Sequence, residues 1–230
     1  MLKIKEVSVV YPDKTKAISN VSFTLNEGDN IALIGENGAG KTSLLLAIVG
    51  ILKLDKGIVE VNSQVLSKDT LDAIRMQIGF VFQNPDDQLF MPRVYDDVAF
   101  GCRNMGLTEE VTSLRVKNTL LSLGIDHLIM KSSLRLSGGE KRMAAIATVL
   151  AMNPSILLFD EPTAFLDPKA KRLLAESLNV LTHPKIIASH DLAFVKDICN
   201  RVIVIKDGHL QADTDISILN DKQALESYGL

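Results

Sequence analysis

The sequence predicts an α/β fold in which a helical segment is inserted into a core of strands and helices. The first observation is an apolar run at 31–34 that leads directly into a glycine-rich loop and a helix. The second is a set of further short apolar runs, at 78–82, 156–159 and 185–189, which are typical of buried strands. The third is helical periodicity from 94 to about 152, which separates the first of these runs from the other two.

The composition indicates an ordinary soluble protein. Its 230 residues suffice for one large or two small domains, and 47% of them are hydrophobic. A net charge of −3 without a long basic run argues against binding nucleic acid or a lipid surface through phosphate contacts. The longest apolar stretch, 44–52, is shorter than the ~20 residues that span a bilayer, and 1–11 lacks the form of a signal peptide. We therefore expect a cytosolic protein without direct membrane insertion, in which Cys102 and Cys199 are buried free thiols.

The chain opens with a predicted pair of antiparallel strands. Alternating apolar residues at 2–9 and 21–25 predict the two strands, and Asn26 to Gly28 closes the second one. Tyr11 lies in the turn between them. An aromatic ring ahead of a ligand-binding loop could stack on a base, but a tyrosine at a strand end more often only packs. Tyr11 alone leaves both interpretations open.

Residues 35–43 read G-E-N-G-A-G-K-T-S and match the P-loop pattern G-x-x-x-x-G-K-[ST]. Glycines at 35, 38 and 40 permit backbone angles closed to other residues, so that successive N–H groups can surround phosphate oxygens. A helix that begins near Gly40 would direct its positive end at the phosphates. Lys41 would then reach the β and γ oxygens, Thr42 would bind Mg²⁺, and Ser43 would add a phosphate contact. A glycine-rich turn that binds nothing is the alternative, but the flanking strand and helix favour a nucleotide site.

After this loop the pattern predicts a short hairpin at 57–65, a helix at 71–76 and a strand at 78–82 that ends at Gln83. The cluster Asn84 to Asp87 should stop any regular element.

The helical segment follows from 94 to about 152. Val111, Leu114 and Leu121 share one helix face, and Glu109 and Glu110 are favourably placed in a first turn. We expect an insert into the α/β core that does not fold independently.

The sequence L-S-G-G-E at 136–140 opens another predicted helix. Ser137 and Glu140 stand three apart, as a capping box requires, so part of the motif has a purely structural explanation. The box does not need Gly138 and Gly139, however. Two glycines would leave the helix N-terminus bare, which favours close approach of a phosphate.

The strand at 156–159 is followed directly by Asp160 and Glu161. Carboxylates at this position, in a chain with a P-loop, are placed to hold Mg²⁺ and to polarise an attacking water. A solvated acidic turn is the alternative, which suits D-E-P-T less well than a single acid. Asp167 and Pro168 then start a helix to about Leu181.

The strand at 185–189 ends at His190, and ligands gather at such strand ends in open α/β sheets. The other three histidines are interpreted as surface or packing residues: His127, His183 and His209. A final hairpin at 201–206 and 209–212 turns at Asp207-Gly208, before a short C-terminal helix.

In this order the motifs resemble the ATPase subunit of an ABC transporter over nearly the whole chain. They are the Walker A loop at 35–42, a Q-loop at Gln83, the signature at 136–140, the Walker B carboxylates from Asp160, the D-loop at Leu166-Asp167 and the switch His190. The resemblance implies the P-loop NTPase fold of ABC ATPases, with an N-terminal antiparallel β subdomain. It implies one domain at 1–230, made of a RecA-like catalytic core at 1–83 and 153–230 and a helical subdomain at 84–152.

The resemblance also implies ATP and Mg²⁺ as cofactors and two subunits that face each other head to tail. Glu161 is then the general base, and His190 contacts the γ-phosphate and positions the water. The implied Mg²⁺ site comprises Thr42, Gln83 and Asp160. Ser137 and Gly139 would act on the partner's ATP. The implied nucleotide-binding residues are Tyr11, Gly35, Asn37, Gly38, Gly40, Lys41, Thr42, Ser43, Gln83, Ser137, Gly138, Gly139 and Asp167.

A narrower resemblance, carried by 82–101 and by S-G-G-E-K-R with V-L-A-M-N-P, is to the energy-coupling-factor importers of cobalt, nickel or vitamins such as biotin. It implies a transmembrane coupling subunit, a substrate-binding membrane subunit and a peripheral place on the cytoplasmic face of the cell membrane. The short C-terminal end favours a homodimer of the metal or biotin type over a heterodimer with a paralogue.

Three positions depart from the family pattern. Phe165 replaces the glycine usual before Leu166, which is expected to tighten or shift the D-loop. Met143 stands where arginine is common, and 133–135 lacks the usual proline. None removes a catalytic group, so we expect hydrolysis. The competing hypotheses are a soluble ABC ATPase acting on nucleic acid or ribosomes, and a regulatory module that binds nucleotide without hydrolysis.

Overall fold

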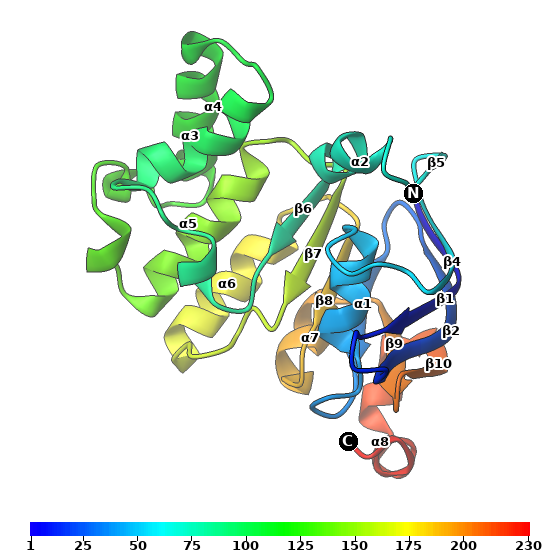
Figure 1. Ribbon diagram of the computed structural model, residues 1–230. Coiled ribbons are helices and arrows are strands. Elements are labelled where there is room, and N and C mark those ends of the chain that lie inside the picture. The colour runs from blue at the N-terminus through cyan, green and yellow to red at the C-terminus, as the bar shows by residue number, and fades with distance from the viewer.

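Two β-sheets with helices between and beside them make up the protein, which is described here over residues 1–230 by a computed structural model (Figure 1). The strands are β1 (Leu2–Val10), β2 (Lys16–Leu25), β3 (Asn30–Ile34), β4 (Lys56–Val61), β5 (Gln64–Val65), β6 (Ile78–Val81), β7 (Ile156–Asp160), β8 (Lys185–Ala188), β9 (Arg201–Lys206) and β10 (His209–Asp215). The helices are α1 (Lys41–Ile48), α2 (Leu71–Gln77), α3 (Val94–Asn104), α4 (Glu109–Ser122), α5 (Gly138–Leu150), α6 (Pro168–Asn179), α7 (Leu192–Ile198) and α8 (Lys222–Tyr228). The predicted α/β class and the element order are confirmed.

The larger sheet has the strand order β10-β9-β3-β8-β7-β6. Its strands run parallel except for β10, which pairs antiparallel with β9. Because parallel strands align their carboxyl ends, the residues that follow β3, β6, β7 and β8 gather at one edge. These are the polar residues that the sequence marked as site residues.

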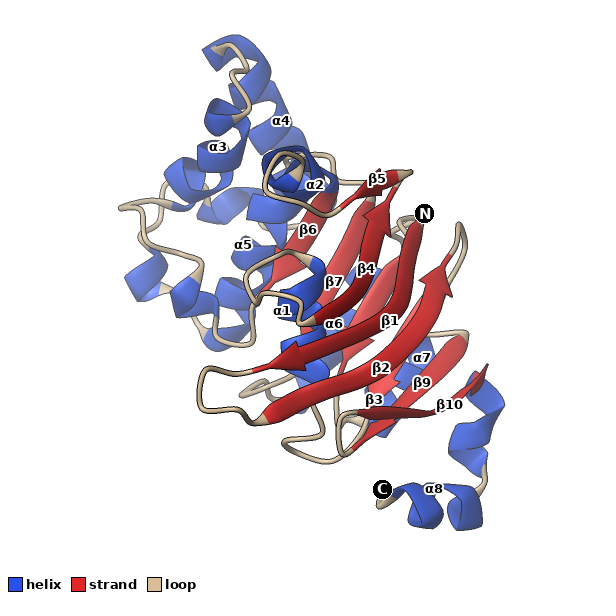
Figure 2. Cartoon of the chain, turned by 45° about the vertical axis from the view of Figure 1, so that its right-hand side comes forward, coloured by secondary structure: helices blue, strands red, loops and turns tan.

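The smaller sheet is antiparallel, with the order β2-β1-β4-β5 (Figure 2). The predicted N-terminal pair is confirmed by the register, in which Leu2 faces Leu25 and Val7 faces Val21. Helix α1 contributes Leu44, Leu45 and Ile48 to one hydrophobic core with both sheets. This core anchors α1, and therefore the glycine-rich loop in front of it, from both sides.

A second hydrophobic core covers the opposite face of the larger sheet. Phe159 of β7 packs there with side chains of α5, α6 and α7, among them Ala145, Leu174 and Val195. The helices from 94 to 150 stand beside this face in both views (Figures 1 and 2). The division of the chain at 84 and 152 stays a prediction.

Helix α4 forms where the periodicity predicts one, but the apolar residues that predicted it face solvent. Val111, Leu114 and Leu121 are 42%, 61% and 65% exposed, whereas the buried residues are Thr112, Val116 and Leu120. Two short apolar stripes run along this helix. Periodicity detects both stripes but does not say which one meets the core.

The cluster after Gln83 is not wholly irregular. Pro85–Asp87 forms a single 3₁₀ turn. Asn84 caps its start, because Asn84 Oδ1 accepts a hydrogen bond from Asp86 N at 3.2 Å. A turn this short fits the turn-forming residues that predicted the loop.

Both cysteines are buried free thiols, as predicted. Burial raises the pKa of Cys199 to about 12 and also raises that of Cys102. The longest helix, α4, has 14 residues, and none of the helices combines the length and apolarity that a bilayer span demands.

Candidate nucleotide site and signature helix

Most of the predicted site residues line one cavity of about 480 Å³ at the carboxyl edge of the larger sheet. Its lining includes Tyr11, Asn37, Gly38, Gly40, Lys41, Thr42, Ser43, Gln83, Glu161 and His190. Three further residues, Thr15, Lys16 and Ala17, line it beside Tyr11 and were not marked by the sequence. Their only signal was proximity to Tyr11 across a tight turn.

The first turn of α1 carries no internal cap. Gly40 precedes it at φ 108°, no side chain caps the helix, and no acidic residue lies in its first turn. A Cβ at Gly40 would lie 2.4 Å from the Ala17 carbonyl oxygen, so only glycine fits this left-handed position. Free N–H groups and the helix dipole together make an anion site. A triphosphate fits this end of α1.

Lys41 is buried and directed into the glycine-rich loop. Its Nζ donates to the carbonyl oxygens of Gly35 at 2.8 Å and Glu36 at 3.1 Å, and lies 4.0 Å from Glu161 Oε1. Burial lowers the pKa of Lys41, while the carboxylates of Glu161 and Asp160 oppose that shift. The ammonium is thus a poorly hydrated cation, which gains strongly from an anionic oxygen.

Thr42 and Asp160 meet across the site, since Thr42 Oγ1 donates to Asp160 Oδ1 at 3.0 Å. Burial raises the pKa of Asp160, and the bond from Thr42 opposes this. No group of three or more His, Cys, Asp and Glu side chains is arranged to hold a metal ion. A hydroxyl, one carboxylate and the nearby Gln83 suit Mg²⁺, which usually keeps waters and phosphate oxygens as its other ligands.

Glu161 follows β7 in a positive-φ conformation, at 43°. Its Oε2 accepts a hydrogen bond from the His190 backbone N–H at 3.3 Å and lies 2.8 Å from His190 Nδ1. The carboxylate is therefore fixed on two sides within the cavity. This geometry suits a general base oriented by an imidazole.

Tyr11 has a contact that its sequence position did not suggest. Its hydroxyl lies 2.8 Å from Ser43 Oγ, so the tyrosine links the β1–β2 turn to helix α1. Both residues line the nucleotide cavity. Base stacking by Tyr11 stays a prediction.

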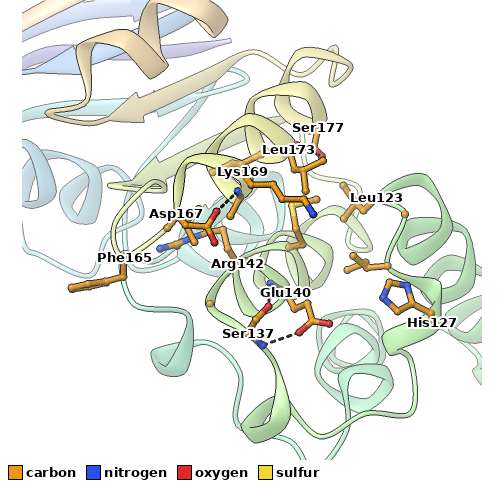
Figure 3. A pocket seen from close by; sticks show the side chains of 18 residues that line it. Leu123, His127, Ser137, Glu140, Arg142, Phe165, Asp167, Lys169, Leu173 and Ser177 are labelled. Carbon is orange, nitrogen blue, oxygen red and sulfur yellow. Dashed lines mark hydrogen bonds between the residues drawn. The ribbon is translucent and has the colours of Figure 1, made fainter.

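The signature residues lie in a different place. Ser137, Gly138, Gly139 and Asp167 line a separate cavity of about 570 Å³ between the start of α5 and helix α6 (Figure 3). The predicted capping box is present, with Glu140 N donating to Ser137 Oγ at 3.3 Å and Ser137 N donating to Glu140 Oε2 at 2.8 Å. Asp167 caps α6 by accepting from Ala170 N at 2.8 Å. The fold does not bring these residues to the P-loop of the same chain.

The two signature glycines differ in their surroundings. A Cβ at Gly139 would lie 3.1 Å from the Cβ of Ala170, so close packing on α6 is a structural reason for this glycine. A Cβ at Gly138 would be 3.7 Å from the Phe165 carbonyl oxygen, an ordinary contact. Only Gly138 therefore lacks an explanation within the chain.

Phe165, the residue in place of the usual glycine, keeps the left-handed backbone that glycine would adopt. Its φ is 63° and its side chain is 90% exposed, directed away from the cavity in Figure 3. Met143 packs, partly buried, against the second core. Residues 133–135, which lack the proline, form a 3₁₀ turn.

The sequence profile of the ABC transporter family matches residues 18–164. The chain belongs to the ABC transporter ATPase family. A putative ABC transporter ATP-binding protein of Geobacter sulfurreducens is 46% identical over 93% of this chain and 86% of its own length. An energy-coupling factor transporter ATP-binding protein of Carboxydothermus hydrogenoformans is 38% identical over 100% of this chain and 86% of its own length.

Solved ABC ATPases share the whole architecture. The structure of CbiO1 from Clostridium perfringens, part of an ABC transporter complex, superposes with a TM-score of 0.86 at 37% identity, covering 97% of this chain and 92% of the other. A dimeric cassette, MJ0796, bound to ADP and phosphate after hydrolysis, gives 0.84 at 27% identity over 94% and 99%. The predicted ABC ATPase fold and ATP hydrolysis as the activity of this family member are thereby confirmed.

Proposed function

We propose that this ABC ATPase is the ATP-hydrolysing subunit of an energy-coupling-factor importer. It works peripherally on the cytoplasmic face of the cell membrane, attached to a transmembrane coupling subunit and, through it, to a substrate-binding membrane subunit. Relatives named as energy-coupling factor ATPases support this, with 38% identity in Carboxydothermus hydrogenoformans and 40% in Methanothermobacter thermautotrophicus.

The observation that carries the proposal is an apolar groove beside the Q-loop. It has a volume of about 280 Å³ and is rich in aromatic side chains. Phe80 and Phe82 have ring centroids 4.7 Å apart, and Phe90 and Phe100 pack edge to face at 5.0 Å. Its lining includes Ile51, Phe80, Phe82, Gln88, Phe90, Phe100, Thr148 and Met152.

This groove fits the end of a helix from a membrane subunit. Phe90 is 63% exposed, although an aromatic ring gains ~2 kcal/mol or more from burial. The two ionisable residues of its lining are engaged within the chain: the Arg75 guanidinium donates to the Val49 and Gly50 carbonyl oxygens, and Asp97 Oδ1 accepts from the Phe90 and Met91 N–H groups. Such an apolar recess with a polar border is typical of helix-in-groove recognition.

Within the nucleotide site, each side chain then has a role that follows from its contacts. Lys41 and the N-terminus of α1 bind phosphate oxygens, and Ser43 adds a further contact. Thr42 and Asp160 hold Mg²⁺ with Gln83, and Mg²⁺ supplies charge neutralisation at the phosphates. Glu161 takes a proton from water, and His190, whose Nδ1 lies 2.8 Å from Glu161 Oε2, orients that carboxylate.

Hydrolysis requires a second copy of the chain in this proposal. Ser137, Gly138 and Gly139 of one copy complete the nucleotide site of the other, which accounts for the distance between the signature and the P-loop within one chain. The dimeric MJ0796 cassette provides the precedent. We propose a homodimer, because the metal and biotin importers resembled by the sequence use one kind of ATPase, and cobalt, nickel or biotin as the cargo.

Photocrosslinking at the groove tests the proposal in native cells. A photoreactive phenylalanine analogue at position 90 should capture a polytopic membrane protein, identified by mass spectrometry. Position 114 on α4 is the matched control, since Leu114 is 61% exposed and Phe90 is 63% exposed. Capture of a ribosomal protein or RNA would instead support a soluble ABC ATPase. Uptake of radioactive cobalt, nickel and biotin in cells lacking the ATPase then distinguishes the cargos.

The oligomeric state is tested with Glu161→Gln, which keeps the shape of the site but removes the base. Light scattering with Mg-ATP should show a monomer that becomes a dimer, since ATP is then bound and not turned over. A variant that binds ATP and stays monomeric would point to a paralogue as the partner. Unchanged turnover in Glu161→Gln would contradict the role of Glu161.

A further inference from the structure

Arg142 lies on helix α5, five positions after Ser137, and is 1% exposed. Its two terminal nitrogens donate to backbone carbonyl oxygens of the Q-loop, Nη1 to Phe82 and Nη2 to Gln83, both at 2.6 Å. The guanidinium therefore holds the backbone of the two residues that follow strand β6. Hydrogen bonds from a charged donor are about twice as strong as those between neutral groups.

A simpler role, filling space in the core, does not account for this side chain. Burial lowers the pKa of Arg142 to about 10, with only the Asp160 carboxylate opposing the shift, and Nε has no hydrogen-bond partner. An apolar side chain of similar volume would fill the space without that desolvation cost. The planar fork of an arginine aims two N–H groups at two adjacent acceptors in a fixed geometry, whereas a lysine offers a single ammonium on a flexible stem.

The neighbouring contacts also join the Q-loop to α5 and not to the sheet. The ladder between β6 and β7 ends at Val81 and Phe159. Beyond it, Phe82 N donates to Gln88 Oε1 at 3.2 Å, and Gln88 Nε2 donates to Ala145 O at 2.8 Å and Thr148 Oγ1 at 2.7 Å. An exposed pair between Lys141 Nζ and Asp86 Oδ1 adds a contact at 2.6 Å.

We propose that Arg142 is a positioning residue for Gln83, which makes the place of the Q-loop in the nucleotide site depend on the position of the signature helix. Arg142 follows Ser137 by less than two helical turns. It holds the backbone of Gln83, which lines the nucleotide cavity together with Lys41 and Glu161. When the start of α5 moves relative to the second copy of the chain, Gln83 moves with it. The inference rests on the proposed role of Gln83 in the Mg²⁺ site.

Steady-state ATPase kinetics of Arg142→Met test this inference. The change keeps an unbranched apolar stem but removes both hydrogen bonds, so kcat should fall about tenfold, as expected for ~1.4 kcal/mol lost in the transition state. KM for ATP should stay within about twofold, because the contacts of the P-loop are untouched. Lys117→Met on helix α4 is the control and should retain nearly all activity, since Lys117 is exposed and lies outside these contacts.

The double variant with Gln83→Ala distinguishes positioning from general damage. If Arg142 acts through Gln83, adding Arg142→Met to Gln83→Ala should cost no further activity. A full additional tenfold loss would overturn the inference and leave the role of Gln83 intact. Wild-type activity in Gln83→Ala alone would instead contradict the proposed role of Gln83.

Arg142→Lys provides a second variant, because loss of a buried guanidinium can unfold a protein. Thermal melting checks that each variant is folded. Lysine keeps a cation but loses the rigid planar fork, so an intermediate kcat with unchanged KM is expected. Full kcat in Arg142→Lys would show that the fork is dispensable and would overturn the inference.

Discussion

Helices α1 and α5 both begin at a glycine-rich turn, yet the groups in their first turns are satisfied in opposite ways. Helix α1 starts from Gly40 without a side-chain cap or an acidic residue. Helix α5 starts from Ser137 with a complete capping box, and Glu140 places a negative charge in its first turn. No side chain occupies the donors of the first end, whereas at the second end Ser137 Oγ accepts from Glu140 N and a carboxylate lies in the first turn.

The difference teaches which of the two ends can bind phosphate alone. An uncapped N-terminus with a buried lysine has strong attraction for a polyanion. A capped N-terminus next to a carboxylate has less, so in the proposed dimer we expect it to add contacts to a ligand that the first end already holds. ATP would then bind first at α1 and afterwards contact the signature helix of a second copy. This order agrees with a dimer that forms only when nucleotide is bound.

Among the changes that test this contrast, Lys41→Ala is expected to have the largest effect. Removing the only ammonium in the glycine-rich loop should weaken ATP binding at least about 100-fold, since ~3 kcal/mol is expected for a lost charged hydrogen bond in a buried site. Isothermal titration with ATP measures the change. Lys56→Ala, at the exposed start of strand β4, is the control. Equal affinity in Lys41→Ala would mean that α1 is not the primary phosphate site.

Gly40→Ala should mainly affect folding. A Cβ would lie 2.4 Å from the Ala17 carbonyl oxygen and 2.7 Å from Ile18 Cδ1, at a backbone angle that disfavours alanine. We expect a loss of roughly 2–3 kcal/mol in the free energy of unfolding. Urea denaturation followed by circular dichroism gives this value. A loss below ~1 kcal/mol would contradict the tight fit of the loop against β2.

Gly138→Ala should lower activity without destabilising the fold, the reverse of what is expected for Gly40→Ala. An alanine here makes only an ordinary contact and has better helix propensity, so the free energy of unfolding should stay the same or rise slightly. The added methyl group would obstruct a partner's nucleotide, and ATPase activity should fall about tenfold, equivalent to ~1.4 kcal/mol. Activity and melting temperature measured together test this. An active variant would remove the signature end from the nucleotide interface.

The smallest effect is expected from Glu140→Gln. The hydrogen bonds from Ser137 lower the pKa of Glu140 below 4.5, so its contribution to stability is present above 4.5 and is lost as pH falls through the lowered value. At neutral pH the variant should therefore be less stable by ~0.5 kcal/mol, because the helix dipole loses a charge partner. Melting curves at neutral and at acidic pH should show this difference decline below 4.5 and disappear once the pH is below the lowered pKa. A difference that is the same at both pH values would rule out the carboxylate as its source.

The sequence allowed prediction of the fold because the site motifs mark the ends of strands. Apolar runs followed by Gly35, Gln83, Asp160 and His190 locate the carboxyl edge of a parallel sheet, and the structure gathers all four there. Local signals also gave the capping box at Ser137, which depends only on residues three apart.

Contacts between distant segments could not be predicted in the same way. Arg142 follows the signature in a sequence that looks like a solvated helix face, and its burial depends on carbonyl oxygens 59 and 60 positions away. The orientation of α4 has the same cause, since its two apolar stripes compete and only tertiary packing selects one. The contact between Tyr11 and Ser43 joins a turn to a helix, and no local pattern encodes the distance between them.

The two buried cysteines make this ATPase a convenient subject for site-specific labelling. Thiolates are the reactive form, and both thiols have raised pKa values and no solvent access, so neither should react with maleimides in the folded protein. A cysteine introduced at the exposed position 165 would then be the only reactive thiol, without any need to remove the native ones. A fluorophore pair placed this way on two copies of the chain could report the approach of their signature surfaces during each cycle of ATP hydrolysis.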